Sequence, residues 1–386
     1  MTAPRLEINL DAIAHNARTL VDRLATKGIR VTGVTKASLG SPGVAKAMLD
    51  GGVVGLGDSR VENLAVLRAD GVAEPLTLIR SPMLSQVDEV VRVADVSLNT
   101  EAVVLDALAT VAAHRRTTHA VILMVELGDL REGVAVDEVV ELARTVDRLA
   151  GLRLVGLGTN LACHSGVVPD QQKMDELSRL VEQAETACGH VLPVVSGGNS
   201  ANLDWALTTN DVGRVDELRL GESILLGTEP LYRRPIDGLQ TDAFTLVAEV
   251  IEATRKPTQP WGEIAQAAFG HQPPAHSRGS IRQVVVALGR QDVDPDGITA
   301  PSGIRKLGMS SDHLVLDVGD SAVSVGDELS FQLDYSALVR AMTSPFATKI
   351  ERDSRYQRPD VTVEPLSESD EPLVNPTGLR GGAAVR

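Results

Sequence analysis

The sequence is poor in aromatic residues and in cysteine. Aromatic residues make up 2% of the 386 residues, whereas hydrophobic residues make up 43%. The core must therefore consist mainly of aliphatic side chains, which is typical of an α/β protein with buried parallel strands. The two cysteines, Cys163 and Cys188, allow no disulfide framework and show no zinc-ligand spacing. We expect no structural disulfides and no metal site.

Cationic residues are scarce relative to acidic ones, and long apolar runs are missing. The chain has 37 Lys and Arg against 52 Asp and Glu, a formal net charge of −15, which argues against a nucleic-acid or anionic-membrane partner. The longest apolar runs, such as residues 120–125, are far shorter than the roughly 20 residues that a membrane-spanning helix needs. The first residues also lack the basic and apolar parts of a signal peptide. We expect a cytoplasmic protein.

Short apolar runs alternate with helix-period segments through the first 236 residues. The runs cover residues 31–36, 53–57, 76–79, 96–98, 121–125, 154–158, 192–195 and 217–220, and segments such as 134–149 and 171–188 lie between them. Eight strands with intervening helices predict a (β/α)8 barrel. A doubly wound sheet would need fewer strands and a glycine-rich first turn, which is absent.

The pattern changes after residue 236. Runs at 244–251, 283–288, 313–318 and 328–333 are typical of strands and have no helical segments between them, which predicts a second, mainly-β domain. We place the barrel at residues 1–236 and the β domain at 237–350. Proline and charged residues dominate residues 351–386, so we predict a disordered tail there.

A lysine follows the first buried run, and glycine-rich turns follow the last two. Lys36 ends an apolar run, where its amine either reaches water or faces a cleft as a nucleophile or base. Residues 196–200 (SGGNS) and 221–223 (GES) follow the seventh and eighth runs. Their amides either bind a phosphate, as in many barrels, or only form tight turns. Lysine and phosphate together indicate pyridoxal phosphate, whose aldehyde forms a Schiff base with lysine.

At these motifs the sequence resembles a known family. It is similar to the fold-type III pyridoxal-phosphate enzymes of the alanine racemase superfamily, and within it to the ornithine and lysine racemase branch. The resemblance extends from about residue 5 to residue 350. Its most specific segments are residues 33–36, 57–64, 125–133, 158–161, 196–200, 218–222, 289–297 and 310–313.

The resemblance implies a pyridoxal-phosphate-dependent amino-acid racemase that transfers the α-proton between two bases and acts on a basic amino acid. Lys36 would bind the cofactor and act as one base, and Arg219 would donate a hydrogen bond to the pyridine nitrogen. Arg131 would lie near the substrate carboxylate, and Asn160 under the cofactor ring. The phosphate would be held by Ser196, Gly198, Ser200, Gly221 and Glu222. A homodimer is also implied, because the second domain completes the partner's site.

The second base stays open. Alanine racemases supply a tyrosine from the partner's second domain, but the corresponding residues 261–270 contain none. His313 is the first candidate, because imidazole titrates near neutral pH, and Asp292 is the second. We expect Tyr335 to reach the phosphate instead. Asp292 and Asp294 are candidates for binding the distal ammonium of ornithine or lysine.

Three alternatives remain at this point. The first is an alanine or broad-specificity racemase. The second is a lyase similar to D-threonine aldolase, which uses a late histidine and cysteine to hold a metal, but no cysteine follows Cys188. The third is a non-catalytic pyridoxal-phosphate carrier, a class that has a single barrel and lacks the second domain predicted here.

Overall fold

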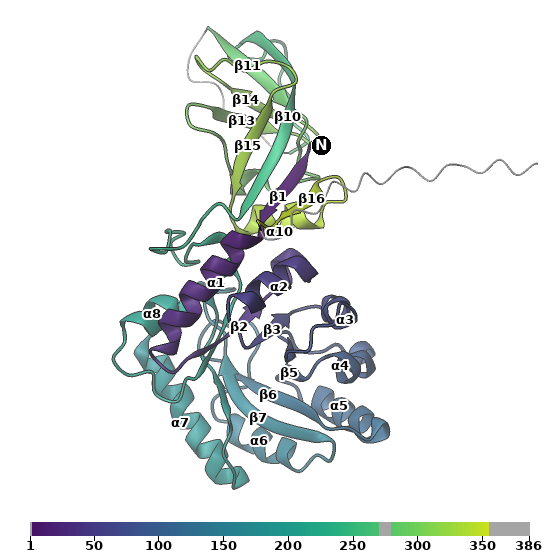
Figure 1. The fold of residues 1–386 in the computed structure, drawn as a ribbon, viewed down its shortest axis with the longest axis vertical. Helices are drawn as coiled ribbons and strands as arrows, with labels where there is room; N and C mark the ends of the chain where they lie inside the picture. Colours follow the sequence, from purple (N-terminus) through teal and green to yellow (C-terminus); the bar gives the residue numbers. More distant parts are fainter. Residues whose placement is uncertain (1, 270–278, 355–386) are drawn as a thin grey trace, which may run out of the picture. The chain divides into compact units, whose positions relative to one another are not determined.

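The computed structural model describes residues 2–269 and 279–354. Its first part is a closed barrel of eight parallel strands (Figure 1). The strands, in barrel order, are β2 (Arg30–Val34), β3 (Gly55–Asp58), β4 (Leu76–Leu78), β5 (Val96–Asn99), β6 (His119–Val125), β7 (Leu152–Thr159), β8 (Val194–Ser196) and β9 (Glu217–Leu220). Pairing of β2 with both β3 and β9 closes the barrel. The predicted (β/α)8 barrel is confirmed.

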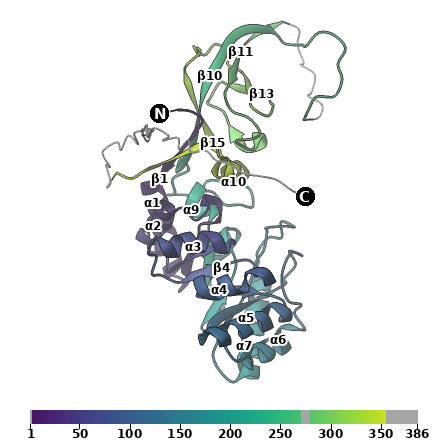
Figure 2. The same ribbon diagram turned by 90° about the vertical axis from the view of Figure 1, so that its right-hand side faces the viewer.

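Helices connect the strands along the outside of the barrel. They are α1 (Leu10–Ala25), which precedes β2, then α2 (Pro42–Asp50), α3 (Val61–Ala69), α4 (Val87–Val93), α5 (Ala102–Arg115), α6 (Val139–Asp147), α7 (Gln171–Cys188), α8 (Leu203–Thr208) and α9 (Glu222–Leu226). Figure 2 shows α3, α4 and α5 side by side on the outer wall. Each covers one side of the strands, as a parallel sheet with two apolar faces requires.

The helix α7 illustrates why these segments fold as they do. Its buried residues recur at helical spacing: Met174, Leu177, Leu180, Val181 and Ala184. The side chain of Asp170 caps the first turn by accepting a hydrogen bond from the Lys173 amide. Gly189 ends the helix with a φ of +81°, a conformation that glycine adopts at little cost.

The second part is an antiparallel sheet with the strand order β12-β15-β10-β11-β14-β13. The bounds are β10 (Phe244–Pro257), β11 (Ser280–Val286), β12 (Ile298–Thr299), β13 (Arg305–Met309), β14 (Leu314–Asp317) and β15 (Glu328–Leu333). The four runs expected from the sequence correspond to β10, β11, β14 and β15. The mainly-β character predicted for this part of the chain is confirmed.

The sheet also contains both ends of the described chain. Strand β1 (Arg5–Asn9) pairs antiparallel with β10 and parallel with β16 (Thr348–Arg352). The sequence analysis assigns residues 1–236, and therefore β1, to the barrel. In the structure β1 belongs to the second sheet, where its side chains Leu6 and Ile8 are buried. Strand β16 extends two residues into the segment predicted to be disordered, and the rest of that segment from residue 355 lies outside the described residues.

One helix of the second part reaches the barrel. Helix α10 (Tyr335–Thr343) follows β15 and packs against the short 3-10 helix η1 (Lys36–Ser38), which follows β2. Asp334 caps α10 by accepting a hydrogen bond from the Ala337 amide. This packing brings Tyr335 to the carboxyl end of the first barrel strand. Within residues 2–269 and 279–354, none of the helices combines the length and apolarity required to cross a bilayer.

Candidate functional site

A cavity of about 480 Å³ lies at the carboxyl ends of the barrel strands. Eight of the residues singled out in the sequence line it: Lys36, Arg131, Asn160, Ser200, Arg219, Gly221, Glu222 and Tyr335. They come from the carboxyl ends of five different barrel strands or the segments that follow them, and from α10. The strand ends of a parallel barrel meet at one rim, so residues distant in sequence converge there.

Lys36 enters the cavity from the turn after β2. The turn is held by the buried Thr35, whose hydroxyl donates to the carboxylate of Asp58 at 2.8 Å. Burial raises the pKa of Asp58, and hydrogen bonds from the Arg60 amide, Thr35 and Asn63 oppose that shift. Leu39 ends the turn in the left-handed region at φ +54°. Lys36 is thus a half-buried amine on a rigid turn.

Tyr335 faces Lys36 from the first turn of α10. The Lys36 Nζ atom lies 5.7 Å from the centroid of the Tyr335 ring, within the range of a cation–π contact. Burial raises the pKa of Tyr335, and the charge and hydrogen bonding of Lys36 partly oppose the shift. The phenol therefore carries its proton at neutral pH and can donate a hydrogen bond into the cavity.

Arg219, on β9, is buried and fixed in orientation. One Nη atom donates to the carbonyl oxygen of Thr159 at 2.8 Å, and the other donates to the hydroxyl of Ser196. The side chain is 4% exposed, and burial lowers its pKa. A guanidinium keeps its charge even so. Ser196 does not line the cavity itself, and its contribution in the structure is to hold Arg219.

The loops after β7 and β8 are joined by Asn199. Its Nδ2 atom donates to Asn160 Oδ1 at 3.0 Å and to the Leu161 carbonyl at 2.8 Å, and it contacts Cys163 Sγ at 3.3 Å. The Nδ2 atom of Asn160 is buried and has no hydrogen-bond partner among the described residues. Because a buried unpaired donor is costly, this atom indicates a place for an acceptor within the cavity.

The two glycine-rich turns contact each other. The hydroxyls of Ser200 and Ser223 lie 3.0 Å apart, and the Ser223 amide donates to Ser200 Oγ. Gly198 does not line the cavity but has a φ of +143°, and a Cβ atom there would lie 2.0 Å from Asn202 Oδ1. The backbone carbonyl of Gly198 accepts a hydrogen bond from the Arg219 amide. These contacts hold the two turns as one unit at the rim.

Glu222 also lies in the second of these turns. Its carboxylate forms an ion pair with Arg233, and burial raises its pKa while Arg233 opposes the shift. Gly221 precedes it, and a Cβ atom at Gly221 would approach Val34 to 3.1 Å. The turn therefore packs closely against the end of β2, next to Lys36.

The sequence analysis identifies only some of the residues that line the cavity. Arg131 is exposed and pairs with Glu132, with 3.0 Å between Nη2 and Oε1, and both line the cavity. Cys163, Arg80 and Arg233 also line it, although the sequence analysis assigns a role to none of them. A signal existed for Arg80, which follows β4, the third strand of the barrel, and for Cys163, which follows Asn160 by three residues.

Besides Ser196 and Gly198, three further predicted residues do not line the cavity of a single chain. Asp292 is 7% exposed, and its carboxylate accepts hydrogen bonds from the Gly289 amide and the Ser344 hydroxyl. His313 is exposed in the turn before β14. Asp294 lines a separate cavity that Tyr335 also lines, and it accepts hydrogen bonds from Ser336 and the Asp296 amide.

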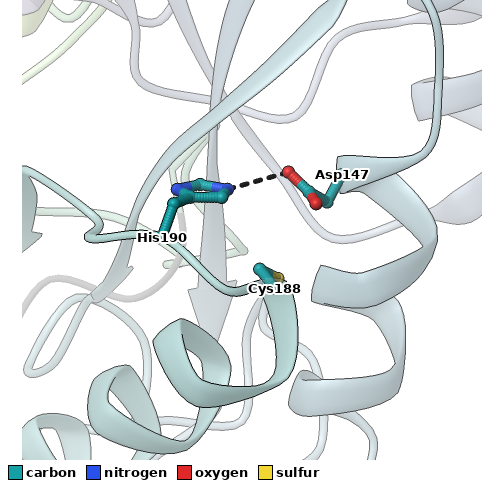
Figure 3. A group of neighbouring side chains, drawn as sticks. All are labelled: Asp147, Cys188 and His190. Carbon is teal, nitrogen blue, oxygen red and sulfur yellow. Dashed lines mark hydrogen bonds and ion pairs between the residues drawn. The ribbon is translucent and has the colours of Figure 1, made fainter.

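A further group of potential metal ligands lies away from the cavity. Figure 3 shows Asp147, Cys188 and His190 turned toward one another at the C-terminal ends of α6 and α7. His190 pairs with Asp147 at 2.8 Å, which raises the pKa of His190, and its Nδ1 atom bonds to the Val191 carbonyl. Burial raises the pKa of Cys188. The ion pair accounts for the arrangement as a link between two helices.

The protein combines a (β/α)8 barrel with a second, antiparallel sheet, and the rim of the barrel carries a lysine and a buried arginine. The family comparison assigns this combination to a known class of protein. Residues 8–230 match the family described as alanine racemase, N-terminal domain, and the chain belongs to that family. The resemblance noted in the sequence is confirmed.

Comparison with individual proteins shows which racemases the chain is similar to. The chain is 37% identical to the lysine racemase of Thermotoga maritima over 353 residues, which cover 91% of this chain and 99% of that protein. It is 34% identical to the ornithine racemase of Acetoanaerobium sticklandii over 352 residues, covering 90% and 99%. The crystal structure of alanine racemase from D-cycloserine-producing Streptomyces lavendulae aligns with a TM-score of 0.72 at 20% identity, covering 92% of this chain and 98% of that one. This last likeness concerns the fold.

Proposed function

We propose that the protein is a pyridoxal-phosphate-dependent racemase that interconverts the L and D forms of a basic amino acid such as ornithine or lysine. The observation that carries the proposal is the convergence of Lys36, Tyr335 and the buried Arg219 in one cavity. The lysine racemase and the ornithine racemase that match nearly the whole chain support the same activity.

The residues of the cavity fit an anionic, planar cofactor. Among the residues that the structure describes, five cationic side chains line it (Lys36, Arg80, Arg131, Arg219 and Arg233), against the two carboxylates of Glu132 and Glu222. A phosphate and the α-carboxylate of a substrate would balance this excess of positive charge. The unpaired Nδ2 donor of Asn160 adds a place for an acceptor on the bound group.

The positions of the residues support the roles that the family resemblance implies. Lys36 would hold the cofactor, and its amine would then take up and return the α-proton on one face of the substrate. Arg219, fixed by Thr159 and Ser196, would donate to the ring nitrogen, and Arg131 would bind the α-carboxylate. The backbone amides around Ser200, Gly221 and Glu222, with the Tyr335 hydroxyl, would hold the phosphate. When bound, the cofactor supplies the electron-withdrawing ring that makes the α-hydrogen acidic.

The identity of the second base depends on whether the protein forms a dimer. In one chain the base candidates His313 and Asp292 lie outside the cavity of Lys36, and Asp292 is engaged in two hydrogen bonds. We propose a homodimer in which a second copy supplies the opposite base, with the exposed His313 as its candidate. Exposed apolar side chains at Trp261, Ile264 and Phe269 offer a surface for such an association.

The proposal is tested by cofactor binding and optical activity together. We expect the purified chain with pyridoxal phosphate to show the absorbance band of lysine-bound cofactor, and Lys36→Ala to lose it. L-Ornithine and L-lysine should lose their circular dichroism signal in the presence of the enzyme. A bound cofactor with no optical change for any amino acid would instead indicate a carrier, and release of an aldehyde or keto acid would indicate a lyase.

A further inference from the structure

The cavity contains two acidic side chains among its described lining residues, and they differ in their partners. Glu222 is paired with Arg233, which itself lines the cavity. Glu132 is half-buried, with 26% of its side chain exposed, and its carboxylate lies 3.0 Å from the guanidinium of Arg131. The partner of Glu132 is therefore the residue expected to bind the substrate carboxylate.

The second feature of the pair is its position at the cavity that also holds Lys36. Glu132 and Arg131 line the cavity together with Arg219. Their charges act on that buried arginine in opposite directions, since Arg131 lowers the pKa of Arg219 and Glu132 raises it. The Arg131–Glu132 pair thus lies where a substrate would meet it, in the loop that follows β6.

Substrate binding would change the partners of this pair. When Arg131 turns to an α-carboxylate, Glu132 loses the cation that faces it. A neutral amino acid would then leave a half-buried carboxylate without a counter-charge, which is unfavourable. A diamino acid brings its own ammonium and restores the pairing. The same carboxylate therefore favours one class of substrate and disfavours the other.

The other acidic candidates are less available. Asp292 is buried and accepts two hydrogen bonds. Asp294 accepts hydrogen bonds from Ser336 and the Asp296 amide, and lines the neighbouring cavity instead. Glu132 is the carboxylate that shares the cavity with Lys36 and whose present partner has another ligand to bind.

We propose that Glu132 receives the side-chain ammonium of the substrate and thereby selects diamino acids over neutral ones. This inference rests on the proposed racemase activity. It assigns to Arg131 and Glu132 a joint role: the two residues pair with each other in the free enzyme and with the two ends of a diamino acid in the complex.

The test compares L-ornithine with L-norvaline, which has the same carbon chain without the ammonium. In Glu132→Gln we expect the ratio of kcat/KM for ornithine to that for norvaline to fall about tenfold or more, because a charge-assisted hydrogen bond is lost. The exposed Glu141 of α6 gives the matched control, and Glu141→Gln should leave the ratio as in the wild type. In Glu132→Asp the carboxylate is withdrawn by one methylene, so the ratio of L-lysine to L-ornithine should rise.

The outcomes separate this inference from the proposed function. An ornithine-to-norvaline ratio that stays within twofold of the wild type in Glu132→Gln overturns the role of Glu132, while racemisation itself stands. A wild-type enzyme that binds the cofactor but racemises neither amino acid overturns the proposed function instead. The absorbance of bound cofactor in each variant reports that the site is still folded.

Discussion

The loop that carries Cys163 depends on one buried carboxylate, and removing it is a sharp test of how the site is held. Asp129 is 1% exposed. Its Oδ2 atom accepts hydrogen bonds from the amides of Cys163 and His164 at 3.2 and 3.0 Å, and its Oδ1 atom accepts one from the Ser165 amide at 3.1 Å. The loop after β6 thus fixes the loop after β7, on which Asn160 and Cys163 line the cavity. We predict that Asp129→Ala loosens both loops.

The size of the effect follows from these bonds. A hydrogen bond to a charged acceptor stabilises by about 1.5–3 kcal/mol. The three amides belong to exposed residues, so water can replace the carboxylate in part, and we expect a loss of about 3 kcal/mol rather than the full sum. The entropy of unfolding is about 2.1 cal/mol/K per residue. Over the 353 residues of the compact unit this corresponds to a fall in Tm of about 4 °C.

The assay is thermal unfolding combined with racemisation of L-ornithine at 25 °C. Asp129→Ala should lower both Tm and kcat/KM, because the misplaced loop no longer presents its residues to the substrate. Asp137→Ala serves as the control, because it makes the same change at an exposed carboxylate in the same loop after β6. It should leave both Tm and kcat/KM near the wild-type values. If the Tm of Asp129→Ala fell by less than 1 °C, the idea that this carboxylate anchors the loop would be refuted.

Three further predictions concern single residues. Burial lowers the pKa of His119 from 6.5 to about 4, so between pH 6.5 and pH 4 the unfolded chain binds a proton at this residue and the folded chain does not. The free energy of unfolding should therefore fall by about 3 kcal/mol as the pH is lowered through this window. His119→Gln should flatten this pH dependence, measured by urea titrations at several pH values. Gly198→Ala places a Cβ atom 2.0 Å from Asn202 Oδ1 and should weaken cofactor binding in a fluorescence titration. Gly166→Ala also introduces a side chain at a positive φ (+71°) but meets nothing within 4 Å, and it should leave cofactor binding unchanged. Tyr335→Phe removes a half-buried phenol beside Lys36 and should raise the cofactor dissociation constant about tenfold. An unchanged constant would exclude a contact with the phosphate.

The barrel was predictable because its signal is repeated and local. Strand β6 is buried along all seven residues, and eight such runs separated by helical periods leave few other architectures. Strand β1 gave no comparable signal. It has only Leu6 and Ile8 on its buried side, and it pairs with residues more than 230 positions away. The pattern of five residues does not indicate which distant strand they pair with.

The site was predictable where strand topology alone brings residues together. Lys36, Ser200 and Arg219 lie close to the ends of parallel strands, and parallel strand ends meet at one rim. The approach of Tyr335 was not predictable in this way, because it depends on the packing of α10 against η1. The aspartates near residue 292 carry a further lesson. Three acidic residues with a proline and a glycine are typical of a solvated turn, yet Asp292 is buried because it caps the Gly289 amide.

The central claim is that Lys36 moves the α-proton of a basic amino acid from within this cavity. The most direct measurement is proton NMR of L-ornithine incubated in D2O with the enzyme and pyridoxal phosphate. The account predicts that D-ornithine forms carrying deuterium at its α-carbon, and that Lys36→Ala forms none. Retention of the α-hydrogen in unchanged L-ornithine with the wild-type enzyme, despite bound cofactor, would contradict it.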